Sequence, residues 1–287
     1  MRCSAVSIVL LLSAAIALLY PGRLFASSAA VFTVKVGELK VSMLSEAQRE
    51  SGLDILIGAS SADVAKFIPS EKYPSAVAAY LVESPEGAIL VDTGFGREID
   101  RNMEYLGVSA GDVKTILITH AHGDHIGGLV KGGRAAYPNA RAVISRLDYE
   151  WSPQAREHIE KYDGRFEAIT PGELGAGGVE IMKGVSAIAA YGHTPGHTMY
   201  LLESEGEKLL IWGDLTHAMA IQMPRPGVSV TYDSDPVAAA EVRASVLKFA
   251  SDGKIPVAGM HVAYPGIGTV EPDPENPGGY KFIPASD

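Results

Sequence analysis

Three imidazoles and one carboxylate fall within the six residues His120-Ala121-His122-Gly123-Asp124-His125. An apolar segment, residues 115–118, is predicted as a strand that leads directly into them. Imidazole and carboxylate groups together favour Zn²⁺ and similar transition metals. Neighbouring residues on a turn cannot all face one ion, so we expect His120 and His122 to face one cation and Asp124 and His125 to face another. The stretch therefore predicts two metal ions side by side.

Later positions in the chain can supply the remaining ligands. His197 is expected as the third imidazole of the first ion, whereas His193 either supports a ligand from outside the ligand set or is satisfied by local hydrogen bonds. Asp214 follows an apolar strand and can place one oxygen on each ion, and His261 completes the set of the second ion. Distant parts of the chain must therefore converge on one site.

Alternating strands and helices are expected to position these residues. Strands are predicted in hairpins at residues 31–43, 78–92 and 200–212, and singly at 142–145, 185–189 and 255–258. Helices are predicted at residues 96–106, 153–162 and 237–250, the last capped by Asp235 and Pro236. Residues 45–76 show no clear pattern, residues 215–234 are predicted as a long loop, and the tail is rich in proline and glycine.

A short internal similarity links two of the predicted hairpins. Tyr80-Leu81-Val82-Glu83-Ser84 matches Tyr200-Leu201-Leu202-Glu203-Ser204, and an acid follows each hairpin at Asp92 and Asp214. Chance and an internal duplication both explain so short a match. A duplication would place two similar halves face to face, with the acids meeting in one cleft.

The chain has 287 residues, 47% of them hydrophobic, and a net charge of −10, which is the composition of an ordinary globular protein. The charge and the absence of Lys/Arg runs disfavour nucleic acid and anionic membranes as partners. Residues 1–29 are predicted as a cleavable signal peptide, with an uncleaved anchor as the minor alternative, so periplasmic or secreted localisation is expected. The single cysteine, Cys3, lies within this segment. Residues 30–287 are then expected to form one domain without thiolate metal ligands.

His120-x-His122-x-Asp124-His125, His197, Asp214 and His261, in that order, resemble the metallo-β-lactamase superfamily over about residues 31–284. Residues 192–198, 213–215 and 261–268 are similar to its methyl parathion hydrolase branch and that branch's lactonase-like relatives. The resemblance implies an α/β fold of the αββα sandwich type, with two facing mixed sheets flanked by helices.

The resemblance also implies a site with two Zn²⁺ per chain, other divalent transition metals being possible. It implies one ion at His120, His122 and His197, and the other at Asp124, His125 and His261, with Asp214 bridging them. Asp92 matches a family position that supports the site from behind the ligands; an ordinary turn acid is the alternative. Acyl-homoserine lactonases carry a tyrosine three residues after the bridging aspartate. His217 stands there instead, as in the organophosphate and aryl-lactone branch.

The resemblance implies a hydrolase of lactones, aryl esters or phosphotriesters that uses a hydroxide shared between the two cations. Asp124 is expected to orient this hydroxide, and His217 either donates a proton to the leaving group or simply packs. Three alternatives stay open: a β-lactam hydrolase, a thioester hydrolase of the glyoxalase II type, and a non-catalytic zinc-binding protein on the same fold.

An apolar pocket is expected beside the metal ions, which favours a small, neutral or weakly charged ester-like substrate. Its walls are predicted to include Phe67, Trp151, Leu215, Met219, Ile221 and Met223. The oligomeric state has no signal in the sequence, and a homodimer stays open.

Overall fold

The computed structural model describes residues 31–286, and the predicted signal peptide and Cys3 lie outside them. The first of two seven-stranded sheets has the order β1-β2-β4-β5-β6-β9-β10. Its strands are β1 (Val31–Val36), β2 (Leu39–Ser51), β4 (Tyr73–Ser84), β5 (Gly87–Val91), β6 (Val113–Leu117), β9 (Arg141–Ser145) and β10 (Phe166–Ile169). The pairs from β1 to β5 are antiparallel and those from β5 to β10 are parallel, so the sheet is mixed.

The second sheet has the order β11-β12-β13-β14-β16-β17-β18. Its strands are β11 (Val179–Met182), β12 (Val185–Ala189), β13 (Thr198–Ser204), β14 (Glu207–Ile211), β16 (Val257–Ala258), β17 (Ile267–Pro272) and β18 (Tyr280–Pro284). Only β14 and β16 pair in parallel. Two small ribbons pair β3 (Leu56–Ile57) with β15 (Ser229–Val230) and β7 (Val130–Lys131) with β8 (Arg134–Ala135).

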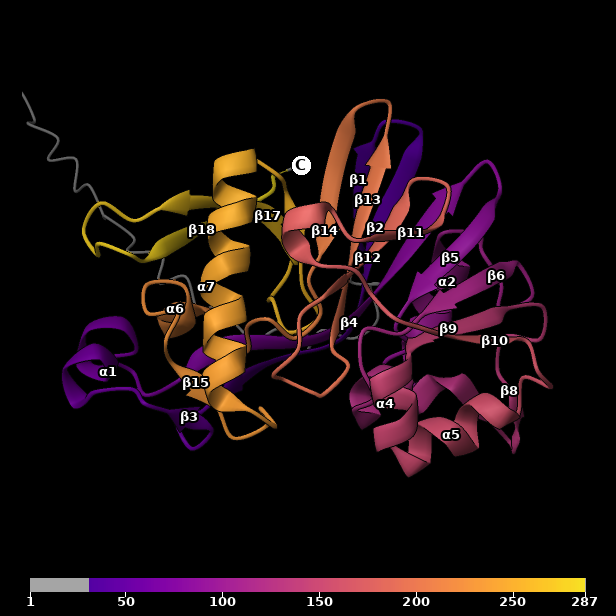
Figure 1. The fold of residues 1–287 in the computed structure, drawn as a ribbon, viewed down its shortest axis with the longest axis horizontal. Coiled ribbons are helices and arrows are strands. Elements are labelled where there is room, and N and C mark those ends of the chain that lie inside the picture. Colours follow the sequence, from indigo (N-terminus) through magenta and orange to yellow (C-terminus); the bar gives the residue numbers. More distant parts are fainter. Residues whose placement is uncertain (1–30, 287) are drawn as a thin grey trace, which may run out of the picture.

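Helices surround the two sheets, and those that pack on the outer faces form the outer layers (Figure 1). They are α1 (Ser61–Phe67), α2 (Ile99–Tyr105), α3 (Gly123–Ile126), α4 (Arg146–Trp151), α5 (Pro153–Glu160), α6 (Met219–Gln222) and α7 (Pro236–Gly253), with short 3₁₀ turns at Gly127–Leu129 and Leu174–Ala176. Ile99 of α2 and Ile159 of α5 pack on the first sheet, and Leu247 of α7 packs on the second.

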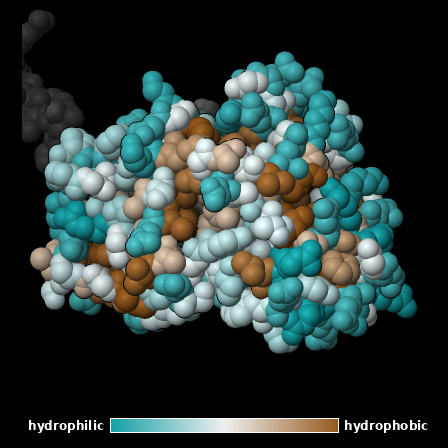
Figure 2. Space-filling model, in the orientation of Figure 1, coloured by the Kyte–Doolittle hydropathy of each residue, from teal (hydrophilic) through white to brown (hydrophobic). Residues whose placement is uncertain are grey.

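The central core lies between the sheets, where strands from both halves bury apolar side chains such as Val91 and Ile211. The arrangement has the layers helix, sheet, sheet and helix, which confirms the predicted αββα sandwich. Figure 2 shows hydrophobic residues gathered over α1 and β3, where Leu56 and Phe67 belong to a small satellite cluster.

The internal similarity corresponds to equivalent hairpins in the two sheets. Tyr80 of β4 pairs with Val91, and Tyr200 of β13 pairs with Ile211, at the same register of each hairpin. Each tyrosine also reaches across the sandwich: Tyr200 donates a hydrogen bond to the carbonyl of Ile118 at 2.8 Å, and Tyr80 donates to carbonyls of the loop around His261. The two halves therefore hold each other's site loops.

Most predicted elements are present, and the differences lie where tertiary pairing decides. The strand β2 extends through residues 45–51 because β4 pairs with it along its whole length. The predicted loop 215–234 contains α6 and β15, and the Pro- and Gly-rich tail forms the hairpin β17–β18. The predicted cap of α7 is confirmed, since Asp235 accepts hydrogen bonds from the amides of Val237 and Ala238.

Within residues 31–286, none of the helices combines the length and the apolar character needed to cross a lipid bilayer.

Candidate metal centre

The predicted site residues converge at one edge of the sandwich, where strands of both sheets end. His120, His122, Asp124 and His125 follow β6, whereas Asp214 follows β14 and His261 follows β16. Their ligand atoms form overlapping groups within 4.8 Å of one another. The first sheet thus delivers the histidine cluster, and the second sheet delivers the central carboxylate.

The first group consists of His120, His122, His193 and Asp214. Nδ1 of His122 lies 3.0 Å from Nε2 of His120 and 3.1 Å from Nε2 of His193. Oδ2 of Asp214 lies 3.3 Å from Nε2 of His193 and 3.5 Å from Nε2 of His120. Three imidazole nitrogens and a carboxylate oxygen therefore face one point.

The second group consists of Asp124, His125 and His261, and Asp214 adjoins it. Nε2 of His125 lies 3.3 Å from Oδ1 of Asp214, and Nε2 of His261 lies 2.9 Å from Oδ2 of the same carboxylate. Asp124 lies 3.7 Å from the first of these nitrogens and 3.5 Å from the second. The Asp214 carboxylate consequently lies between the two groups, where it was expected.

The structure reverses the expected roles of His193 and His197. Nδ1 of His197 donates to the carbonyl of Ala190 at 3.0 Å, and Nε2 accepts from the backbone amide of Asp214 at 3.1 Å. Both ring nitrogens are thus engaged, and the prediction of His197 as a metal ligand is wrong. A Cβ on Gly213 would lie 2.4 Å from that Nε2, so only glycine allows the ring to sit beneath Asp214. His193 supplies the third imidazole instead.

Buried hydrogen-bond acceptors hold the Nδ1 side of three imidazoles that face Asp214, namely those of His125, His193 and His261. Nδ1 of His125 donates to Asp92 at 2.7 Å, Nδ1 of His193 donates to Asp233 at 2.8 Å, and Nδ1 of His261 donates to the carbonyl of Ala76 at 2.7 Å. A neutral ring with its proton on Nδ1 presents a lone pair at Nε2. All three Nε2 atoms face the Asp214 carboxylate, and together with it they form a donor set that fits a cation.

Orphaned polar atoms support the same conclusion. Nε2 of His125, Oδ1 of Asp214 and Nδ1 of His217 are buried without hydrogen-bond partners among the described residues. Unpartnered buried groups are costly, and they concentrate where a ligand completes the site. The donor set of imidazoles and carboxylates fits zinc and similar divalent metals.

The histidines of the cluster differ in the direction in which their surroundings shift the pKa. Burial lowers the pKa of His122 to about 4 and that of His197 to about 3. Burial also disfavours a charged ring at His125, yet the carboxylates of Asp214, Asp124 and Asp92 outweigh it and raise its pKa well above 6.5. Burial opposes ionisation of Asp214 as well, but the surrounding histidines hold its pKa well below the ordinary value. The cluster thus favours positive charge at its centre.

Asp92 supports the site from behind, as the resemblance implied. Its carboxylate is fully buried and accepts hydrogen bonds from the Thr119 amide at 2.8 Å, the Thr119 hydroxyl at 2.7 Å and Nδ1 of His125. The Asp92 side chain therefore fixes both the start of the histidine loop and the orientation of one of its rings.

Two further buried carboxylates had no signal in the sequence. Asp148 of α4 accepts hydrogen bonds from the Ala121 amide at 2.8 Å, the Gly196 amide at 2.7 Å and the Thr194 hydroxyl at 2.9 Å. It therefore ties the His120–His122 loop to the loop that carries His193. Asp233 orients His193, and only the fold brings it there.

Comparison with known proteins agrees with this geometry. The metallo-beta-lactamase superfamily model matches residues 73–255, which is more than half of the chain. This chain belongs to the metallo-beta-lactamase superfamily. The fold and the histidine cluster described above are therefore those of a superfamily member.

Among superfamily members, an N-acyl homoserine lactonase of a Bacillus species is 30% identical over 166 residues, covering 48% of this chain and 62% of that protein. A ribonuclease of Thermus thermophilus is 27% identical over 166 residues, covering 52% of this chain and 37% of that protein. The chain spans about 60% of the length of the curated lactonases it matches.

Two solved structures share the fold closely. AidC, a dizinc quorum-quenching lactonase in complex with its product, superposes with a TM-score of 0.80 at 24% identity, covering 90% of this chain and 98% of that one. The hydrolase AbOPH superposes with a TM-score of 0.79 at 24% identity, covering 91% and 99%.

A cleft of about 570 Å³ opens over the metal centre of this superfamily member. Its floor contains His122, Asp124, Asp214, His217 and His261, and its walls come from residues 49–55 with Tyr73, Phe95 and Tyr232. His217 is buried, and its Nε2 lies 3.1 Å from Oδ2 of Asp214. Burial lowers its pKa to about 4, so the ring is neutral near pH 7.

Most of the predicted pocket residues lie elsewhere. Phe67, Met219 and Met223 line a separate groove between α1, α6 and the β17–β18 hairpin. Leu215 and Ile221 are core residues, since the first packs under α7 and the second joins the satellite cluster. The predictions for these five residues are wrong, because the segments that carry them turn away from the cleft. Trp151 alone adjoins the site, with its ring 5.9 Å from that of His122.

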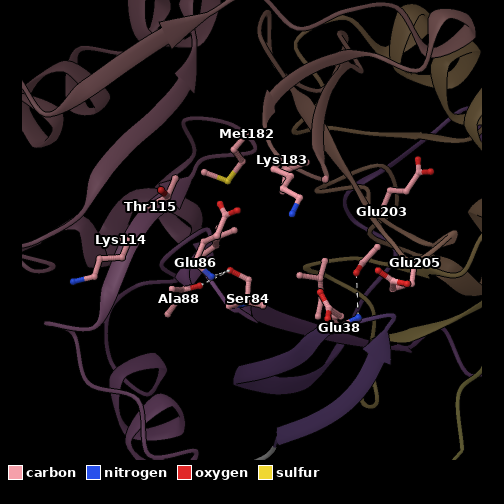
Figure 3. A pocket seen from close by; sticks show the side chains of 17 residues that line it. Glu38, Ser84, Glu86, Ala88, Lys114, Thr115, Met182, Lys183, Glu203 and Glu205 are labelled. Carbon is pink, nitrogen blue, oxygen red and sulfur yellow. Dashed lines mark hydrogen bonds between the residues drawn. The ribbon is translucent and has the colours of Figure 1, made fainter.

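A second hollow lies at the opposite end of the same strands (Figure 3). The turns β4–β5 and β13–β14 form part of it, whereas Asp92 and Asp214 follow the other ends of these hairpins. Its side chains include Glu38, Glu86 and Lys183. The hollow contains none of the clustered histidines, so the chemistry belongs to the first cleft.

Replacing Asp92 by asparagine is expected to weaken cation binding about 10- to 100-fold. Asparagine has one acceptor oxygen in place of two, so its NH₂ group faces either the Thr119 amide or the pair formed by the Thr119 hydroxyl and Nδ1 of His125. Titration against a chelator of known affinity measures the change. Asp112→Asn, an exposed carboxylate bound only to Ser109, is the control. Equal affinity of Asp92→Asn and the unaltered protein would contradict the role given to Asp92.

Proposed function

We propose that this chain is a secreted hydrolase that uses two Zn²⁺ ions, or similar divalent metals, to cleave lactones and related aryl esters or phosphotriesters. One observation carries the proposal. The Asp214 carboxylate lies between two groups of metal-ligating side chains, one made with His120, His122 and His193 and the other with Asp124, His125 and His261. Other divalent metals of similar ligand preference suit the same donors.

Bound cations of this kind lower the pKa of water and polarise a carbonyl or phosphoryl oxygen. The protein's residues hold the reactants in place. Asp214 sets the spacing of the two groups, and Asp92 and Asp233 fix the rings of His125 and His193. Asp124 is the more exposed of the two cluster carboxylates on the cleft floor, with 22% of its side chain exposed against 2% for Asp214. It is placed to orient the attacking water and accept its proton.

His217 is better suited to support than to acid catalysis. Its Nε2 faces Asp214, and a neutral ring with the proton at that position has no proton on Nδ1 to deliver to a leaving group. We therefore propose that His217 holds the Asp214 carboxylate through Nε2.

Lactones are the first substrate class to test, because curated relatives are N-acyl homoserine lactonases and the cleft is a mixed surface of aromatic and polar groups. Export remains a proposal that rests on residues 1–29. Analysis of the mature N-terminus after expression in a Gram-negative host tests it.

The activity is tested with purified protein on a substrate panel, before and after chelation. The panel contains an N-acyl homoserine lactone, dihydrocoumarin, a p-nitrophenyl ester, methyl parathion and nitrocefin. Turnover of at least one of the first four is expected, to be lost on chelation and restored by zinc.

Each contrary outcome identifies a different error. Turnover that survives chelation overturns the metal mechanism. Preferred turnover of nitrocefin identifies a β-lactam hydrolase. Two bound cations without turnover of any panel substrate overturn the proposed hydrolysis and leave a thioester hydrolase or a non-catalytic metal-binding protein.

A further inference from the structure

A β-bulge interrupts β2 beside the metal centre. The strand pairs regularly with β4 as far as Ser45 opposite Ala78, and pairing resumes with Ala47 opposite Val77. Glu46 is therefore the extra residue of β2. Bulges near active sites redirect a side chain that would otherwise follow the regular alternation of the strand.

The redirected Glu46 carboxylate binds the loop between β5 and α2. One oxygen accepts a hydrogen bond from the Phe95 amide at 2.8 Å, and the other accepts from the Arg97 amide at 2.8 Å. The approach is close, since a Cβ on Gly94 would lie 1.8 Å from the carboxylate. Burial raises the pKa of Glu46, and the backbone amides of the loop partly offset this effect.

The bound loop forms one wall of the cleft. Phe95 lines the cleft together with Asp124, and 45% of its surface is exposed. The guanidinium of Arg97 lies 5.5 Å from the centre of the Phe95 ring. The start of the loop is held separately, because the Thr93 amide and hydroxyl both donate to the carbonyl of His125 at 2.8 Å. The Gly94 carbonyl accepts from the Gly128 amide at 3.1 Å, and beyond it the bonds to Glu46 hold the amides of Phe95 and Arg97.

We propose that Glu46 is a positioning residue that holds Phe95 as the apolar wall of the substrate cleft and so sets selectivity for long apolar chains on the substrate. The inference rests on the proposed ester and lactone hydrolysis. Glu46 itself touches neither the metal ligands nor the substrate. An ordered aromatic wall contributes contact area to a long acyl chain and little to a short one.

The test compares N-decanoyl and N-butyryl homoserine lactones as substrates of Glu46→Gln, Phe95→Ala and the double variant. Glutamine keeps the size of the side chain but turns an NH₂ group towards one of the two amide donors. Glu46→Gln is expected to lower kcat/KM for the decanoyl substrate about tenfold through KM, with the butyryl value and the metal content unchanged. Phe95→Ala should show the same loss, and the double variant should lose no more than either single variant.

Binding of the hydrolysed products provides a readout that does not need turnover. The ratio of calorimetric affinities for N-decanoyl- and N-butyryl-homoserine should fall in Glu46→Gln as the kinetic ratio does. Glu167→Gln is the matched control, because Glu167 is exposed on the same sheet and pairs only with Arg141. Phe95→Ala leaves the Glu46 bonds in place and keeps the test possible if Glu46→Gln fails to fold.

The outcomes separate this inference from the proposed function. An unchanged selectivity ratio in Glu46→Gln, or additive losses in the double variant, overturns the positioning role. Failure of the unaltered protein to hydrolyse either lactone counts against the proposed function, and the product affinities then still decide the role of Glu46.

Discussion

Replacing His193 by alanine is expected to remove one bound cation per chain and to lower kcat/KM more than about 100-fold. The Nε2 lone pair of His193 faces His122 and Asp214, and no neighbouring side chain replaces it. The loss should exceed that of Asp92→Asn because a ligand is removed and not merely its support. Elemental analysis and steady-state kinetics on the same preparation measure both effects.

His197→Phe is the variant to compare with His193→Ala. Both nitrogens of His197 bind the backbone, so phenylalanine should keep the cation stoichiometry at saturating metal. It leaves the Asp214 amide and the Ala190 carbonyl unpaired, which is expected to cost about 2 kcal/mol of unfolding free energy. The opposite result, with two cations kept in His193→Ala and one lost in His197→Phe, would restore the assignment predicted from the sequence.

Removal of the metal ions is expected to abolish turnover and to destabilise the fold. Imidazole nitrogens and the carboxylates of Asp124 and Asp214 meet at one point only in the folded chain, so a cation that binds them binds the folded state. A ligand that binds only the folded state at 100 times its Kd stabilises that state by about 2.7 kcal/mol. Differential scanning calorimetry with and without chelator should show the lower Tm, and zinc should restore both Tm and activity.

The loss of metal should become easier as the pH falls, because protons compete with the cation for the imidazole nitrogens. Circular dichroism of the chelated protein at 25 °C controls for global unfolding. Equal melting temperatures of the chelated and zinc-loaded proteins would show that the histidine cluster binds no cation.

The strongest local signals in the chain led to a correct prediction of where the histidine and aspartate cluster lies. The spacing of His120, His122, Asp124 and His125 after an apolar strand, and the acid after each hairpin, indicated a metal site at strand ends, and the structure brings these residues together. The αββα fold followed from the resemblance, and its helices and hairpins have local cues in caps, turns and alternating apolar residues.

The wrong predictions concern properties that sequence neighbours do not control. His193 and His197 lie four residues apart on the same turn, and their roles differ because β13 begins at Thr198 and turns the second ring under Asp214. The apolar residues Met219 and Met223 resemble a pocket wall in composition, yet the path of their segment directs them to another groove.

The cluster of imidazoles and carboxylates at a strand end can be recognised from the amino-acid sequence alone, since ligand chemistry and hydrophobic periodicity are local properties. Which ring nitrogens face the site depends on long-range packing, because each ring is oriented by partners as distant in sequence as Asp92, Asp233 and Ala76. The cleft wall also depends on distant residues, since Glu46 at the bulge of β2 binds the amide of Phe95 in the loop after β5.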